Sequence, residues 1–305
     1  MNLLYRLAWS VVPHLPPRLV DAVAGWVGAL VGSLNIASVR QLRRNYHQLT
    51  GRDPSRSELR RAVASYFRCF AQQFSLPGWS DQYLRSGCIY PGAARVAELM
   101  TEGPVVLALT HSGNWDLAGA WFCQNHGPIV TVAEKLEPAE LFDQYVNFRS
   151  NLGMEILGVA PGEKVFERLV ETVAGRSVLV PLLADRDISG SGIRVQLGGG
   201  EALVAAGPAA LALRLKRPLI AGHITYERRG RRWVIRAEFT EPIPVPTPEP
   251  GETDVEALTR AWVRTIEPTL LRGLVDWHMM QKLYVADLDP ARLARAEARH
   301  RGETP

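Results

Sequence analysis

A histidine and an aspartate, His111 and Asp116, lie five positions apart in residues 107–116, whose sequence is LALTHSGNWD. This segment begins as an apolar run typical of a buried strand and continues into a polar turn that contains glycine. An imidazole can accept a proton from a hydroxyl group at neutral pH, and a carboxylate on its other ring nitrogen fixes the tautomer. Because no Ser or Cys nucleophile motif accompanies the pair, we expect His111 to activate a hydroxyl of the substrate, with Asp116 as its orienting acid.

Such a pair needs a rigid scaffold, and from residue 90 onward strand-like apolar runs alternate with helix-like stretches. We expect strands at 105–109, 129–133, from 156, at 177–183, 219–223 and 233–239, the last at an antiparallel edge. We expect helices at 56–74, 93–100, 117–124, 140–152, 165–174, 208–214 and 255–271. The alternation predicts an α/β fold with a mixed, mostly parallel central sheet flanked by helices.

Further polar residues follow two of these strands. Glu134 and Lys135 come directly after 129–133, and Asp185 and Arg186 come after 177–183. Ligands of open α/β sheets bind at the carboxyl ends of the strands, so we expect these residues near His111. The alternative for Glu134 and Lys135 is an ordinary surface pair at a helix start. The glycines at 190–200 predict a flexible loop after Asp185.

Five segments carry a resemblance to a known family: THSGNWD, VAEKLEP, FRSNLGMEILG, LLADRDISGSG and AAGPAALALRLKRPLIAG. The H-x-x-x-x-D box resembles that of the glycerolipid and lipid A acyltransferase superfamily. The ordered set of segments, spread over residues 30–288, is similar to the actinobacterial phosphatidylinositol mannoside acyltransferases. The resemblance therefore covers nearly the whole chain.

The resemblance implies transfer of a long acyl chain from acyl-CoA, with palmitoyl-CoA as co-substrate, to a mannose hydroxyl of a phosphatidylinositol mannoside. It implies that His111 is the base and that Asp116, Glu134 and Asp185 form the acidic cluster around it. No bound cofactor and no metal ion are expected, because acyl transfer needs only a base and stabilisation of the oxyanion. Hydrolysis of the thioester by the same base is the side reaction expected when the acceptor is absent.

The resemblance also implies residues that hold the substrates. Arg149 would hold the acceptor headgroup, because guanidinium donors suit phosphate and sugar hydroxyls, although a solvent-exposed helical arginine is an equal alternative. Lys135 and Arg186 would bind phosphate. Asn114, in the tight turn, would adopt a left-handed conformation and help to aim a backbone N–H at the oxyanion.

One position departs from the family pattern. The family often has glutamate where this chain has Asp185. The aspartate side chain is one methylene shorter, which leaves open whether it contacts His111 directly. Asp116 or a water molecule would otherwise take its place.

The ends of the chain indicate how it meets its surroundings. Residues 1–75 are expected to form a helical, membrane-associated region that belongs to one domain with the acyltransferase core at 76–288, and 289–305 form a charged tail. The uncharged stretch 22–39 has the minimum length of a membrane span, but its Gly, Ser and Asn residues favour a packed or interfacial helix. We therefore expect a peripheral protein on the cytoplasmic side of the inner membrane.

Charge and cysteine content agree with that location. The formal net charge is only +4, but arginines cluster at 40–61 and 214–232, which suits an anionic partner. The resemblance makes that partner an anionic membrane surface rather than nucleic acid. Cys69, Cys88 and Cys123 have neither disulfide nor zinc spacing, as in a reducing compartment.

Two other functions remain open from the sequence. The same fold could acylate another acceptor, a lipid A precursor or a lysophospholipid. A non-catalytic membrane-binding relative is the second alternative, and the intact His111–Asp116 pair argues against it.

Overall fold

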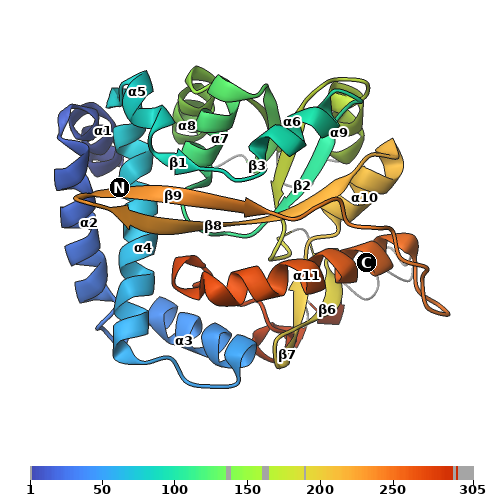
Figure 1. Cartoon of the computed structure of the whole chain (residues 1–305). Helices are drawn as coiled ribbons and strands as arrows, with labels where there is room; N and C mark the ends of the chain where they lie inside the picture. The colour runs from blue at the N-terminus through green and yellow to red at the C-terminus, as the bar shows by residue number, and fades with distance from the viewer. Residues whose placement is uncertain (1, 135–138, 160–164, 189, 291–292, 295–305) are drawn as a thin grey trace.

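The computed structural model describes residues 2–134, 139–159, 165–188, 190–290 and 293–294. The chain opens with helices, as predicted for residues 1–75: α1 (Asn2–Val11), η1 (Val12–His14), α2 (Pro17–Val31), α3 (Ala37–Thr50) and α4 (Arg56–Ser75). Helices α2 and α4 lie side by side (Figure 1). The 3-10 turn η2 (Leu76–Gly78) and the short helix α5 (Asp81–Arg85) lead into the sheet.

The uncharged stretch 22–39 is not one helix. Helix α2 ends at Val31, and α3 begins only at Ala37, after a turn that contains Gly32. Over the residues that the model describes, we find no helix with the length and apolar character that crossing a bilayer requires.

The central sheet has the predicted mixed, mostly parallel character. Its strands are β1 (Cys88–Ile89), β2 (Val105–Leu109), β3 (Ile129–Glu134), β4 (Met154–Val159), β5 (Leu179–Leu183), β8 (Leu219–Arg229) and β9 (Arg232–Phe239). Their order is β1-β9-β8-β2-β5-β3-β4, and within it only the β8–β9 pair is antiparallel. Strand β9 is antiparallel to β8 as expected, but it is not the edge, because β1 pairs with its other side.

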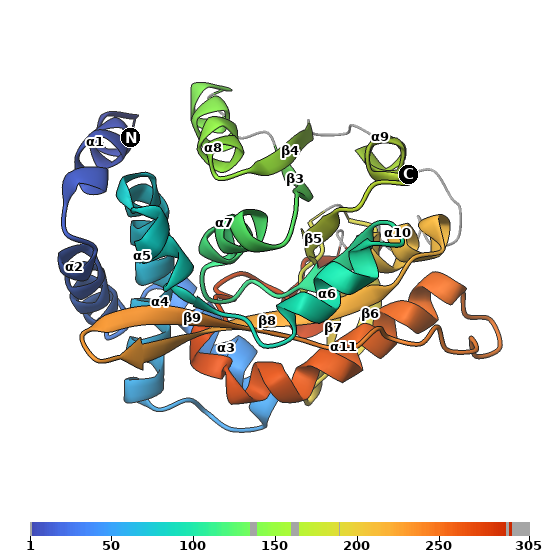
Figure 2. The same ribbon diagram turned by 45° about the horizontal axis from the view of Figure 1, so that its top comes forward.

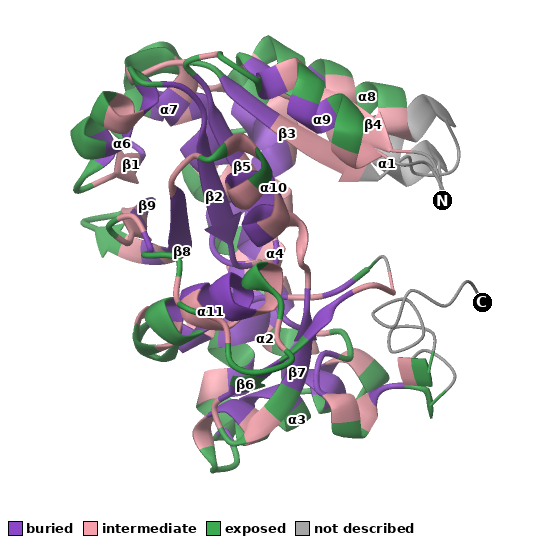
Figure 3. Ribbon diagram, turned by 90° about the vertical axis from the view of Figure 1, so that its right-hand side faces the viewer, coloured by how far each residue is buried: buried purple, intermediate pink, exposed green. Residues whose placement is uncertain are grey.

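Helices cover both faces of this sheet. They are α6 (Ala93–Met100), α7 (Trp115–Asn125), α8 (Ala139–Asn151), α9 (Val165–Val173), α10 (Gly207–Leu215) and α11 (Asp254–Arg272). Side chains of β2 alternate between two apolar clusters: Val106 and Ala108 face α9, α10 and α11, whereas Val105 and Leu107 face α6 and α7. In Figure 2, α7 and α8 lie above the β8–β9 ribbon and α11 below it. Strand β2 is buried along its whole length, which explains its continuous apolar sequence (Figure 3).

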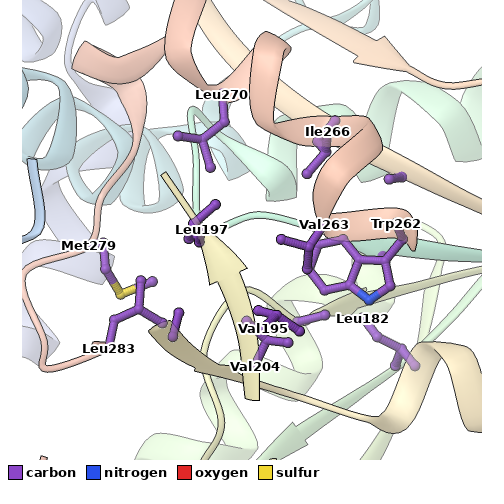
Figure 4. Close-up of a cluster of buried hydrophobic side chains, with 14 of the residues drawn as sticks. Leu182, Val195, Leu197, Val204, Trp262, Val263, Ile266, Leu270, Met279 and Leu283 are labelled. Carbon is purple, nitrogen blue, oxygen red and sulfur yellow. The ribbon is translucent and has the colours of Figure 1, made fainter. Parts of the chain in front are cut away.

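The segment predicted as a flexible glycine loop is instead a hairpin, β6 (Ile193–Leu197) and β7 (Gly200–Val204). Gly198 has a φ of +59°, and a Cβ there would lie 2.1 Å from the carbonyl oxygen of Leu49, so glycine is needed for the turn. The hairpin packs its apolar face on α11. Figure 4 shows this contact through Val195, Leu197, Val204, Trp262, Val263, Ile266 and Leu270.

Candidate active site

Two parallel strands bring His111 and Asp185 together. Strands β2 and β5 are paired in register up to Leu109 and Leu183, and the Ala184 amide donates to the Leu109 carbonyl at 2.9 Å. His111 and Asp185 each lie two residues past the end of their strand, at the same edge of the sheet. The prediction that polar residues after these strands meet is therefore confirmed for this pair.

Asp185 contacts His111 directly, which settles the question raised by its shorter side chain. Its Oδ1 lies 2.5 Å from His111 Nδ1, and its Oδ2 accepts from the His111 backbone amide at 3.0 Å. Oδ2 also accepts from Trp277 Nε1 at 2.7 Å. Because Nδ1 faces a carboxylate, it carries the proton, and Nε2 is left as the basic nitrogen of His111.

The surroundings keep Asp185 ionised and leave His111 accessible. Burial alone acts to raise the pKa of Asp185, but the charge of His111 and the hydrogen bonds from His111 and Trp277 hold it below its usual value. The His111 side chain is 20% exposed, and its Nε2 has no hydrogen-bond partner among the residues described. A substrate hydroxyl can therefore approach Nε2.

A chain segment from the far C-terminal side fixes the His111 turn. The His278 amide donates to the His111 carbonyl at 2.7 Å, and the Gly113 amide donates to the Asp276 carbonyl at 3.0 Å. Gly113 has a φ of +53°, and a Cβ there would lie 2.5 Å from Ile224 Cγ2, so only glycine fits. The turn is rigid, which suits a base that must be aimed at a substrate.

The prediction that Asp116 orients His111 is wrong. Asp116 lies in the first turn of α7, where its Oδ1 accepts from Arg149 Nε at 2.7 Å and its Oδ2 from Gln73 Nε2 at 2.6 Å. The side chain is 1% exposed and points toward α8 and α4. Asp116 therefore clamps three helices together, and Asp185 is the partner of the histidine.

Arg149, on α8, forms the ion pair with Asp116. Burial acts to lower the pKa of Arg149, but the charge of Asp116 and the hydrogen bond to it outweigh burial, so the pKa is raised. The alternative of a solvent-exposed arginine is excluded, because its side chain is only 18% exposed. Contact with an acceptor headgroup stays a prediction.

Asn114 caps α7. Its Oδ1 accepts from the Leu117 amide at 2.9 Å, and its Nδ2 donates to Gln72 Oε1 at 3.0 Å. Its backbone is extended, and the left-handed conformation expected for it belongs to Gly113. The cap satisfies an amide at the helix start, while any contact with substrate remains a prediction.

The structure gives less detail for three other predicted site residues, Glu134, Lys135 and Arg186. The backbone of Glu134 ends β3 beside Val159 of β4, and its side chain is not described. Lys135 lies outside the described residues. Arg186 is partly buried and follows Asp185 at the same sheet edge. Their roles remain predictions.

Within the described part of the chain, no group of three or more His, Cys, Asp or Glu side chains is placed to hold a metal ion.

Sequence reasoning missed Trp277, whose indole N–H completes the surroundings of Asp185. The two residues are 92 positions apart, and the only sequence signal is a tryptophan next to His278 in an apolar run. His278 itself is buried, with 4% of its surface exposed.

The fold and the His111–Asp185 pair define a class of protein, and comparison with known families agrees. The model of the bacterial lipid A biosynthesis acyltransferase family matches residues 1–285, so the chain belongs to this family and is an enzyme that transfers acyl groups. The chain is 33% identical to the phosphatidylinositol mannoside acyltransferase of Mycolicibacterium smegmatis, over 95% of this chain and 93% of that protein. It is also 33% identical to the phosphatidylinositol mannoside acyltransferase of Mycobacterium tuberculosis, over 97% of this chain and 92% of that protein.

Two buried histidines make the stability of the protein depend on pH. Burial lowers the pKa of His223 to about 4 and that of His278 to about 3. An unfolded chain protonates both near pH ~6.5, so between pH ~6.5 and ~4 it binds more protons than the folded chain. The free energy of unfolding should therefore fall as the pH falls through this range.

Urea unfolding at several pH values measures this effect. The variant His223→Gln should flatten the slope by up to about 1.4 kcal/mol per pH unit, whereas the same change at exposed His47 should not. Equal slopes for His223→Gln and the wild type would rule out His223 as a source of the effect.

The hydrogen bond from Trp277 to Asp185 should matter for turnover. We expect Trp277→Phe to keep the ring packing but lower kcat about tenfold with little change in KM, because a hydrogen bond to a buried charge is lost. Steady-state kinetics measure both constants. The matched control is Trp79→Phe, which removes one hydrogen bond to Ser75 away from His111. Equal kcat values for the two variants would contradict a positioning role for Trp277.

Proposed function

We propose that this acyltransferase moves a long acyl chain from acyl-CoA to a mannose hydroxyl of a phosphatidylinositol mannoside. The observation that carries the reaction class is the His111 ring, held at Nδ1 by buried Asp185 and open at Nε2. The acceptor is proposed from the names of the two mycobacterial relatives, which are similar to this chain over more than nine-tenths of their length.

The proposed reaction has a simple proton path. His111 Nε2 accepts the proton of the acceptor hydroxyl as its oxygen attacks the thioester carbonyl carbon. The tetrahedral intermediate expels the coenzyme thiolate, which receives the proton back from the imidazolium. Asp185 stabilises the imidazolium throughout, and the N–H of Trp277 holds Asp185 in place.

Other residues at this sheet edge would position the substrates. We assign phosphate or sugar contacts to Lys135, Arg149 and Arg186, and a supporting acidic role to Glu134. Arg149 is supported by its fixed position, because its ion pair with Asp116 holds a side chain that is 18% exposed.

The enzyme is proposed to work while docked on an anionic membrane surface, on the cytoplasmic side of the inner membrane. Of the twelve large hydrophobic side chains that are exposed in the described part of the chain, nine lie between Leu7 and Ile36, in α1, in α2 or in the segments that follow them. They are Leu7, Val11, Leu15, Leu19, Val23, Trp26, Leu30, Leu34 and Ile36. A stripe of this kind along α1 and α2, at one side of the molecule in Figure 1, is typical of helices that lie in a membrane interface.

A labelled-acyl transfer assay tests the reaction. Purified protein is incubated with radiolabelled palmitoyl-CoA and a mixture of phosphatidylinositol mannosides, and the lipids are separated. We expect label in a mannoside lipid, a loss of about 10²–10⁴-fold for His111→Ala, and a loss of about 100-fold or more for Asp185→Asn. His47→Ala, a change of the half-exposed histidine on α3, is the matched control.

Other outcomes of this assay are equally informative. Equal transfer by His111→Ala would remove His111 from the mechanism. Label found only in free fatty acid, with every lipid acceptor supplied, would refute acyl transfer to a lipid. Label in a lipid A precursor or lysophospholipid alone would replace the proposed acceptor.

The apolar stripe has its own test. We expect Trp26→Ser, at a side chain that is 70% exposed, to weaken binding to anionic phospholipid vesicles about tenfold or more, because the indole no longer enters the interface. Vesicle sedimentation measures binding. The matched control is Leu271→Ser, an exposed apolar residue on α11. If both variants bind like the wild type, this stripe is not the docking face.

A further inference from the structure

A cavity of about 640 Å³ lies between α4, the antiparallel pair of strands β8 and β9, and the C-terminal end of α11. In Figure 1 this pair of strands reaches α2 and α4, and the end of α11 lies below it. The cavity is rich in charge. Its charged lining residues are Arg61, Arg68, Arg236, Arg272, Glu227, Glu238 and Asp276.

Two of these arginines contact carboxylates in the cavity wall, and the pair formed by Arg272 is exposed to solvent. Arg236 donates to Glu227, and Arg272 Nη2 lies 3.2 Å from Glu238 Oε2. Arg61 and Arg68 then stand against a single remaining carboxylate, Asp276.

Asp276 forms a direct ion pair with neither arginine among the residues described. Its Oδ1 accepts from Ser65 Oγ at 2.6 Å, and its Oδ2 accepts from the Tyr226 amide at 2.9 Å. Burial raises the pKa of Asp276, and the charges of Arg68 and Arg61 act against that rise, so one carboxylate is shared by two arginines. The cavity therefore carries an excess of positive charge.

Arg68 is the most deeply buried of the arginines that line the cavity. It is only 6% exposed, and its guanidinium carbon lies 3.9 Å from the centre of the Trp233 ring. Its Nε has no hydrogen-bond partner, and among the residues described no carboxylate lies within ion-pair distance. A buried charge without a paired anion costs several kcal/mol, and stacking on an aromatic ring returns only part of that.

We propose that this cavity binds a phosphate group through Arg61, Arg68 and Arg272. A guanidinium that packs on an aromatic ring can still form two parallel hydrogen bonds to a phosphate through its N–H groups. Arg61 and Arg272 lie at the exposed rim. Arg61 adds charge where the ligand enters, and Arg272, which contacts Glu238 through Nη2, still offers Nη1 and Nε. The chemical class of the ligand is a phosphate ester.

The cavity is separate from the His111 site. Ser65 lines the cavity, and its hydroxyl contacts His278 Nε2 at 3.0 Å. His278 in turn lies against Trp115, which neighbours His111. Ser65 and His278 thus lie between the cavity and the His111 site. Phosphate binding in the cavity can therefore be measured independently of catalysis at His111.

The phosphate ester can come from two sources. Helix α2, which carries part of the exposed apolar stripe, places Gly25 beside Arg68, so that a Cβ there would lie 3.2 Å from Nη2. A phospholipid headgroup is one source, and a soluble phosphate ester is the other. The binding experiment separates them.

Isothermal titration calorimetry on the full chain tests the proposal with glycerol 3-phosphate, and vesicle sedimentation tests it with phosphatidic acid against phosphatidylcholine. We expect Arg61→Gln and Arg272→Gln each to weaken binding about tenfold, because each removes a charge-assisted contact. Arg68→Gln should abolish binding, with circular dichroism as its test of folding. Arg214→Gln, an exposed arginine on α10, is the matched control, and His111→Ala should bind like the wild type.

The outcomes distinguish a soluble ligand from a lipid headgroup, and both of these from the absence of a phosphate site. Binding of glycerol 3-phosphate that is weakened by Arg61→Gln and Arg272→Gln supports a soluble ligand. The same pattern with phosphatidic acid vesicles alone supports a lipid headgroup. Absence of binding to either probe, or equal binding by the two rim variants and Arg214→Gln, would overturn the proposal. Loss of binding in His111→Ala would also overturn it, because the ligand would then occupy the catalytic site.

Discussion

The structure of this enzyme depends on one buried carboxylate. Asp185 is 1% exposed and accepts three N–H groups: the amide and the ring Nδ1 of His111, and the indole of Trp277. A carboxylate removed from water is tolerated only when its oxygens are bonded. Those bonds join the ends of β2 and β5 to the segment that follows α11. The interaction that stabilises the charge therefore also fixes the tautomer and the direction of the His111 ring.

The two acids of this site have divided roles because helix geometry separates them. Asp116 is close to His111 in sequence, but α7 begins at Trp115, so residue 116 lies on the helix and turns toward α4 and α8. Asp185 is distant in sequence but adjacent in the sheet, because paired parallel strands place equivalent residues side by side. The shorter aspartate reaches both the ring and the backbone because the two strand ends remain hydrogen-bonded at Ala184.

Much of the fold could be predicted because buried parallel strands have continuous apolar sequences and the helices between them are amphipathic. The same reasoning placed His111 and Asp185 at one edge of the sheet. The hairpin β6–β7 was missed although Ile193, Val195 and Leu197 alternate with polar residues, because the neighbouring glycines were interpreted as flexibility. The contact of Trp277 with Asp185 could not be predicted, since no local pattern encodes a pair of residues joined only by the packing of distant segments.

The sequence does not determine which partner a buried arginine has in the folded protein. Arg149 and Arg68 both lie on helices, and both are largely removed from water. Arg149 meets Asp116, so its charge is balanced inside the protein, whereas Arg68 meets the ring of Trp233 and its Nε has no acceptor. The difference depends on which elements pack against each helix, and neither spacing nor net charge reports that. Because ion pairing stabilises the fold without a ligand, Arg149 is fixed by the protein. Arg68 has only the longer-range charges of Asp21 and Asp276, so it is the arginine whose charge we propose an outside anion to balance.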